Sequence, residues 1–447
     1  MSFDLDTYVA RYRGHTRAKR LIFIAENSAT YCKEALNLAV EFCKNGDVRN
    51  STGVRGIALE IENCKLSYVY KEICSNFSTK SNTSEHVACD RAWLDSTEKA
   101  EEELQNRLSN QLEEALSNNI KESIRMAQVD LGNFHYARGD MENALKWYTR
   151  TRDYCTNSAH IRDMCLNVIR VCIASNRYLT ALTYIPKAEQ ALKQPDKITT
   201  AKLKSAAGLA SIASLDFHAA ANNFITVPSE LGSEFSDLIA PEDIALYGGI
   251  CALATFDRHE LKQKVIENPK FRFFLELMPR VRELVKSFHD SDYKQLLGIL
   301  KSLETDIKLD IHLSQHHEVL YQNIWKRALI QYVSPYSSVC LKKMAKIFET
   351  NVSALEAELA KLIMQDDYDT ENSVTTNGPR LSIQARIDSH NKILYARQAN
   401  DDQREITYRK AFAMGEEFCL EAQASILRAN LGTERIVYTA SSSSKTK

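Results

Sequence analysis

Glycine and proline are scarce in this sequence, which has 14 glycines and 8 prolines among 447 residues. Turn-rich β architectures and disordered tracts use both residues heavily, so the scarcity argues against them. Helix interiors disfavour glycine and proline more than any other residues. We therefore predict a mostly α fold.

Long apolar runs and an excess of one charge are also missing. The longest apolar runs are as short as Leu21 to Ala25, whereas a membrane-spanning helix needs about 20 consecutive apolar residues. The N-terminus lacks an apolar core followed by a small-residue cleavage site, so we expect no secretory signal and an intracellular protein. The 57 Lys+Arg balance 58 Asp+Glu. This balance predicts no membrane partner and argues against nucleic acid.

Signatures of metal and nucleotide chemistry are absent as well. The eleven cysteines include no C-x-x-C pair, and neither a phosphate-binding loop nor a G-x-S-x-G elbow occurs. The best metal candidate is His312 and His316, four residues apart on a possible helix face, followed by His317 and Glu318. It lacks the H-E-x-x-H order and a third ligand. We predict no metal and no cofactor.

One short stretch has the residue types of a hydrolase triad: Asp388, Ser389 and His390. Three consecutive side chains point in different directions and cannot place a base between a nucleophile and an orienting acid. Asp and Asn at 388 and 391 are typical of a turn. We therefore interpret the stretch as a hairpin turn and predict no catalytic residue.

What the sequence does contain is a helical repeat. The segment DLGNFHYARGDMENALKWYTRTRDY has the small-residue spacing of a tetratricopeptide-like helical hairpin, and weaker copies follow at intervals of 37 and 39 residues. Small residues let paired helices approach, and a glycine forms the turn between them. We predict a right-handed helical-repeat solenoid in which these residues pack the pairs: Gly132, Gly139, Ala144, Tyr148, Ala181 and Ala220.

A different pattern begins near residue 312. Helices are predicted near 318–333 and 338–349, and a third helix begins with a capping box of Ser353 and Glu356. Ile383, Ala385 and Ile387 alternate with polar residues, which predicts a strand, and a second strand follows near 392–397. Helix, turn, helix and two strands form a winged helix. Its third helix is acidic, which argues against DNA binding.

Helical repeats followed by a winged helix resemble the PCI-domain family, whose module is shared by the proteasome lid, the COP-nine (COP9) signalosome and a translation initiation factor. Several long segments resemble the subunit-one family of the signalosome more closely. They span the chain from about residue 4 to 431 and include RLIFIAENS, ESIRMAQVDLGNFHYARGD, YTRTRDYCT, IAPEDIALYGGICALATFDRHELKQKVI and ARIDSHNKILYAR.

The resemblance implies a non-catalytic scaffold in a complex that removes Nedd8 from cullins through a separate zinc metalloprotease subunit. The implied partners are the other signalosome subunits, both PCI subunits and the metalloprotease subunit, and cullin–RING ligases. It also implies a cytoplasmic and nuclear location. Two alternatives stay open: a proteasome-lid PCI subunit, and a nucleic-acid-binding winged-helix protein.

Two surfaces are predicted to assemble the complex. An exposed edge of the wing can extend a sheet into another subunit. In the last helix, apolar residues recur in steps of four and three, which is typical of a helix that packs lengthwise on others. That helix either folds back on its own body or, as the family's helical bundle implies, packs on other subunits. The candidate interface residues are Arg386, Ile387, Asp388, Ile393, Tyr395, Tyr408, Phe412, Cys419 and Ile426.

These patterns divide the chain into five parts. They are an N-terminal helical region at 1–94, the repeat body at 95–311, the winged-helix part of the PCI domain at 312–400, a C-terminal assembly helix at 401–431 and a flexible tail at 432–447. Within the winged-helix part, the polar stretch 365–380 is predicted to be a disordered insertion, because it has too little apolar content to fold alone.

Overall fold

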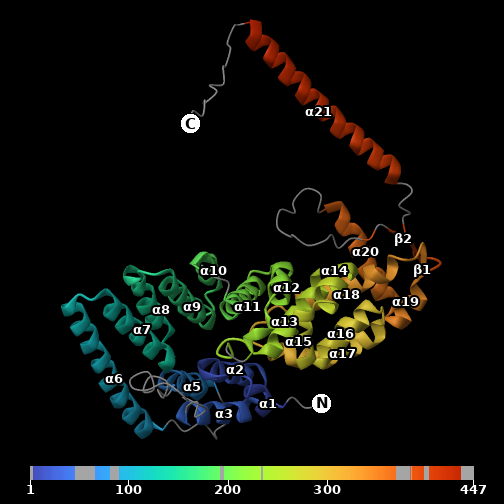
Figure 1. The fold of residues 1–447 in the computed structure, drawn as a ribbon. Coiled ribbons are helices and arrows are strands. Elements are labelled where there is room, and N and C mark those ends of the chain that lie inside the picture. The colour runs from blue at the N-terminus through green and yellow to red at the C-terminus, as the bar shows by residue number, and fades with distance from the viewer. Residues whose placement is uncertain are drawn as a thin grey trace.

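The computed structural model describes residues 4–45, 66–80, 90–191, 196–232, 235–368, 383, 385–396 and 402–433. The described chain is mostly α-helical, as predicted, with a three-stranded sheet near its C-terminal end. The helices form an arc, the sheet lies at one end of it, and the last helix projects away from the rest (Figure 1). None of the described helices is long and apolar enough to cross a membrane.

The N-terminal helices form a small unit with its own core, which lies beside the middle of the arc (Figure 1). Its buried residues include Leu21, Ile24, Phe42 and Tyr70, and Leu309 of the body also reaches this core. The unit comprises α1 (Leu5–Val9), α2 (Gly14–Asn27), α3 (Cys32–Asn45) and α5 (Ser67–Lys80).

The body is built from paired helices in which each element packs on its neighbours along the chain. The first of them, α6, spans Arg91–Asn118, so the predicted boundary between 94 and 95 falls inside a helix. The others are α7 (Lys121–Arg138), α8 (Met141–Arg150), α9 (Ser158–Ala174), α10 (Tyr178–Ala191), α11 (Lys197–Ala213), α12 (Phe217–Ile225), α13 (Pro241–Thr255), α14 (Arg258–Glu260), α15 (Pro269–Leu277), α16 (Pro279–His289) and α17 (Tyr293–Lys308). Two short 3-10 helices, η1 (Thr151–Tyr154) and η2 (Ser229–Leu231), and the π-helix η3 (Leu261–Ile266) lie between them.

The same turn joins the helices of successive pairs. Its first residue has a positive φ, and the next N–H donates to the carbonyl five residues back, which satisfies the end of the first helix. In three of these turns the next residue is an aspartate that caps the second helix: Asp140, Asp216 and Asp292. The five positive-φ residues are Gly139, Asn176, Leu215, Ser291 and Glu349. The repeat turn therefore recurs as far as the winged module.

Close approach of paired helices depends on glycine at two positions. A Cβ added to Gly132 of α7 would lie 2.5 Å from the ring of Tyr148 in α8, and one added to Gly208 of α11 would lie 2.6 Å from the ring of Phe224 in α12. Each glycine comes eight residues before the capping aspartate and each ring eight residues after it. The ring therefore fills the space that the glycine leaves. The other three predicted packing residues, Ala144, Ala181 and Ala220, are fully buried.

Helix α13 lies at the centre of the body. Every residue from Asp243 to Ala254 is buried, and the helix contacts α12, α15, α16 and α18. A helix with apolar residues on all sides must be enclosed on all sides. The adjacent Gly248 and Gly249 let Phe271 and Val281 approach its backbone.

The winged module comprises α18 (His317–Val333), β1 (Ser338–Cys340), α19 (Leu341–Ile347), α20 (Val352–Tyr368), β2 (Ala385–Asp388) and β3 (Ile393–Ala396). The strands are antiparallel in the order β1-β3-β2. Val339, Leu394 and Ile387 lie side by side across the sheet, and Leu394 is fully buried. This row joins the sheet to the main core.

Three sequence predictions for this module are wrong. The helix expected at 338–349 begins only at Leu341, because Ser338–Cys340 pairs with β3 as a strand. The third helix begins at Val352, so Ser353 is inside it and cannot be the capping residue. The disordered insertion was expected to begin at residue 365, but α20 continues to Tyr368. Residues 369–380 of that insertion lie outside the described residues, as does most of the predicted tail.

Candidate functional site

The wing offers a strand edge at β2. Ile393 and Tyr395 belong to β3, which is the central strand and pairs on both sides. Of the predicted wing residues, only Arg386, Ile387 and Asp388 lie on an outer strand. Tyr395 is 47% exposed, and its Cα pairs with that of Arg386 on the face away from the core. The β2 backbone and this face are therefore among the parts of the wing that a partner could contact, and β1 is the other outer strand.

The turn between β2 and β3 has a structural explanation. Asp388 Oδ1 accepts hydrogen bonds from the backbone N–H of His390 at 3.0 Å and of Asn391 at 3.2 Å. These bonds hold the pKa of Asp388 below its usual value. Ser389 Oγ and Lys392 Nζ instead contact Glu356 of α20, the latter at 2.7 Å. Glu356, predicted to cap a helix, ties that helix to the wing.

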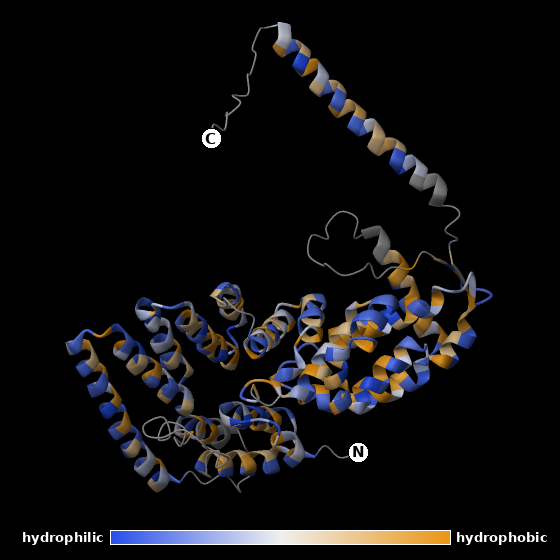
Figure 2. Cartoon of the chain, viewed as in Figure 1, coloured by the Kyte–Doolittle hydropathy of each residue, from blue (hydrophilic) through white to orange (hydrophobic). Residues whose placement is uncertain are grey.

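Helix α21 (Asp402–Thr433) exposes nearly all of the side chains described along it. Hydrophobic and hydrophilic residues alternate along this helix (Figure 2). The predicted seam residues Tyr408, Phe412, Cys419 and Ile426 are all exposed, with Phe412 at 72%. The structure does not show the helix folded back on the body (Figure 1). Further exposed apolar residues lie outside the seam: Met414, Phe418, Leu420, Leu427 and Leu431.

The polar residues of α21 lie in two rows along the helix. At about 100° of turn per residue, Lys410, Glu417, Glu421 and Arg428 fall within an arc of about 40°, and Arg409, Glu416 and Gln423 lie about 100° to 140° from its centre. Apolar side chains occupy both flanks of the predicted seam. A helix of this kind needs more than one neighbouring helix to bury its apolar surface.

A buried ionic network holds the N-terminal unit against the body. Arg20 of α2 is 1% exposed and donates to Asp310 Oδ2 at 2.7 Å and to Asp243 Oδ2 at 3.2 Å. Tyr12 donates to Asp243 at 2.7 Å, and Tyr247 donates to Asp310 at 2.7 Å. The two carboxylates belong to the body and the arginine to the N-terminal unit, so the network joins the two cores.

The network holds two carboxylates and one guanidinium away from water. Burial raises the pKa of Asp243 to about 6 despite the nearby charge of Arg20. Burial also works to raise the pKa of Asp310, but the Arg20 charge and hydrogen bonds from Arg20 and Tyr247 leave it below its usual value. Burial lowers the pKa of the adjacent His312 to about 4. At neutral pH this histidine is therefore uncharged and adds no second cation.

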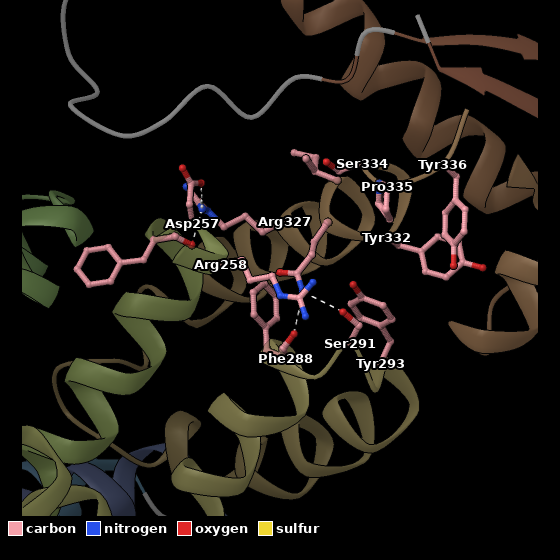
Figure 3. A pocket seen from close by; sticks show the side chains of 13 residues that line it. Asp257, Arg258, Phe288, Ser291, Tyr293, Arg327, Tyr332, Ser334, Pro335 and Tyr336 are labelled. Atoms are coloured by element: carbon pink, nitrogen blue, oxygen red, sulfur yellow. Dashed lines mark hydrogen bonds and ion pairs between the residues drawn. The ribbon is translucent and has the colours of Figure 1, made fainter. Parts of the chain in front are cut away.

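A cleft of about 450 Å³ lies where the body meets the winged module. Its walls come from the α13–α14 turn, the α16–α17 turn and the end of α18 with the segment that follows it (Figure 3). It contains two arginines, Arg258 and Arg327, and one acid, Asp257. Arg327 holds the end of α13 by donating to the carbonyls of Ala254 at 2.8 Å and Phe256 at 2.7 Å. Sequence reasoning missed this cleft because its walls come from three distant segments.

Comparison with known proteins identifies the family. The chain is 43% identical to COP9 signalosome complex subunit 1 of Arabidopsis thaliana, over 96% of this chain and 89% of that protein. It is 34% identical to COP9 signalosome complex subunit 1b of Drosophila melanogaster, over 96% of this chain and 85% of that one. The chain belongs to the COP9 signalosome subunit 1 family. The PCI domain model matches residues 300–367, and the model described as 26S proteasome subunit RPN7 matches residues 90–264.

The chain also resembles a proteasome subunit. The chain is 26% identical to 26S proteasome non-ATPase regulatory subunit 6 of Caenorhabditis elegans, over 68% of this chain and 73% of that protein. The signalosome relatives are more similar and cover more of the chain. The resemblance found in the sequence is therefore confirmed.

The two histidines considered as metal ligands, His312 and His316, contact different residues in this member of the subunit 1 family. Residues 312–316 precede α18, so His312 and His316 do not share a helix face as considered from the sequence. His312 Nδ1 is 3.2 Å from the Tyr178 hydroxyl, and the ring of His316 packs edge-on to Phe217. Among the described residues no three His, Cys, Asp or Glu side chains could hold a metal ion together.

Proposed function

We propose that this chain is a non-catalytic scaffold subunit of a COP9 signalosome, the complex that removes Nedd8 from cullins of cullin–RING ubiquitin ligases. The observation that carries the proposal is the similarity to signalosome subunit 1 proteins over 96% of the chain. The exposed α21 supports it, because a helix with so much unburied apolar surface requires partner helices.

In this proposal the wing and α21 attach the chain to other subunits. The β2 edge adds main-chain hydrogen bonds between subunits, and α21 enters a helical bundle. The N-terminal unit and the solenoid reach neighbouring subunits or cullin–RING ligases. The cytoplasm and nucleus are the proposed locations.

A proteasome-lid subunit is the second candidate, favoured by the RPN7 match and the proteasome relative. Nucleic acid is a weaker candidate, because Glu356 and Glu358 lie on the third helix of the winged module, where a phosphate backbone would need cations.

The test is a mild affinity purification of the tagged chain from its own cells, with identification of the partners and a cullin-deneddylation assay on the eluate. Recovery of a metalloprotease-containing assembly that cleaves the conjugate supports the scaffold. Recovery of proteasome base subunits supports the second candidate. Nucleic acid without a stable assembly contradicts both.

A further inference from the structure

The cleft between the body and the winged module is rich in hydrogen-bond donors that lack protein partners. Arg258 is exposed, and among the described residues its guanidinium makes no hydrogen bond or ion pair. Tyr293 is 1% exposed, yet its hydroxyl makes no hydrogen bond of ordinary geometry, although Ser291 and Gln331 lie near it. A buried hydroxyl without a partner is costly, so this one calls for a ligand or an ordered water.

Arg327 adds a second cation in the same wall. It is 7% exposed, and it donates hydrogen bonds to two backbone carbonyls at the end of α13 and, at 3.3 Å, to Asp257. The Asp257 side chain is 63% exposed, so this acid is well hydrated and neutralises the buried charge only weakly. Within the described part of the chain, no hydrogen bond engages Nη2 of Arg327. The cleft therefore keeps an excess of positive charge.

Hydroxyl groups and aromatic rings complete the cleft. Ser291, Ser334 and Tyr332 line it together with Tyr336, whose side chain is 52% exposed (Figure 3). The rings of Tyr332 and Tyr336 lie 5.8 Å apart. Ser291 lies at a repeat turn with φ of 64°, which brings its side chain and that of Tyr293 to the same wall. Guanidinium and hydroxyl donors suit a tetrahedral anion, and aromatic rings suit the residues beside it on a peptide.

The geometry points to a binding site for a phosphorylated serine or threonine side chain on an extended segment of a partner protein. The phosphate would bind between Arg258, the Tyr293 hydroxyl and the Arg327 face of the cleft, and the flanking residues would lie against Tyr332 and Tyr336. Phosphate carries more charge and more acceptor oxygens than a carboxylate, which matches two arginines and several hydroxyls better than one acidic side chain does. The site needs no other subunit to be complete, so it stands apart from the scaffold proposal.

The test uses the full chain, immobilised, and three pools of short degenerate peptides that differ only at a fixed central residue: phosphoserine, serine or glutamate. We expect phosphoserine peptides to be retained at least about tenfold over serine peptides, as one charge-assisted contact predicts. Arg258→Gln should lower this retention about tenfold, and Tyr293→Phe should lower it as well. Arg282→Gln is the matched control, because Arg282 is an exposed arginine on α16 that does not line the cleft.

Equal retention of the phosphoserine and serine pools would overturn the site. Equal retention of the phosphoserine and glutamate pools would overturn the preference for phosphate, and equal losses in Arg258→Gln and Arg282→Gln would show only general charge attraction. Free phosphoserine, added as competitor, should displace the peptides weakly. If it displaced them as well as an enriched phosphopeptide does, the ligand would be a small molecule and the peptide assignment would be wrong.

Discussion

At the residue scale, Arg20 has the largest expected effect on stability. Its guanidinium lies between two buried carboxylates, so its removal leaves uncompensated negative charge in the protein interior. Arg20→Met should lower the free energy of unfolding by about 3 to 5 kcal/mol, measured by urea denaturation. Arg13→Met, at an exposed arginine just before the same helix, is the control and should change it little. Equal stability of the two variants would contradict the role of the network.

Asp243 makes the same network sensitive to pH. Its native pKa of about 6 lies above the ordinary 3.8, so the native state binds a proton that the unfolded state has released. This contribution to stability is complete below the ordinary pKa and is lost as pH rises through about 6. Between pH 5 and 7 the group should therefore lower the unfolding free energy by about 1 kcal/mol. Asp243→Asn should remove this part of the slope in urea denaturation, whereas Glu242→Gln should keep it.

Residues like Arg20 mark the limit of sequence reasoning. An arginine at the start of an apolar stretch such as RLIFIA is usually solvated. Its partners, Asp243 and Asp310, are more than 220 residues away in the sequence, so no local pattern connects them. The cleft with Arg258 and Arg327 escaped notice for the same reason, since contacts between distant segments leave no periodicity.

At the element scale, local patterns were more informative. The repeat turn was predicted from Gly139, and the two wing strands from alternation, because both depend on neighbouring residues. Strand β1 was missed because Ser338–Cys340 is too short to alternate visibly, and only pairing with β3 makes it a strand. The prediction of a capping box was wrong. The sequence Ser353-x-x-Glu356 has the residue types of the motif, but the Glu356 side chain contacts Lys392 of the wing instead.

The glycine under the Tyr148 ring gives an element-scale prediction. Gly132→Ala should lower the free energy of unfolding by about 1 to 3 kcal/mol, because the new methyl group would overlap the ring and force α7 and α8 apart. Gly298→Ala in α17 is the matched control. A Cβ there meets nothing within 4 Å, so alanine should raise stability by about 0.5 to 1 kcal/mol through its better helix propensity. Urea denaturation of both variants measures the contrast, and the same sign of change in both would contradict it.

At the scale of the whole molecule, α21 separates assembly from folding. Its exposed apolar side chains contribute to no core cluster, so a chain that ends after residue 401 should melt at the temperature of the full chain. The same truncation should abolish recovery of partner subunits in affinity purification, because the apolar surface of α21 would be lost.

Point variants distinguish this loss from a general effect of shortening the chain. Phe412→Asp and Phe418→Asp place charge in the apolar arc and should each reduce partner recovery at least about tenfold, as for hot-spot residues. Glu417→Arg changes a residue next to Phe418 that lies in the polar row with Lys410, Glu421 and Arg428. This variant should leave recovery unchanged, because that row faces solvent when neighbouring helices pack on the other sides of α21. Full recovery after truncation, or equal losses in all three variants, would show that α21 does not attach the chain to its partners and would leave that role to the β2 edge.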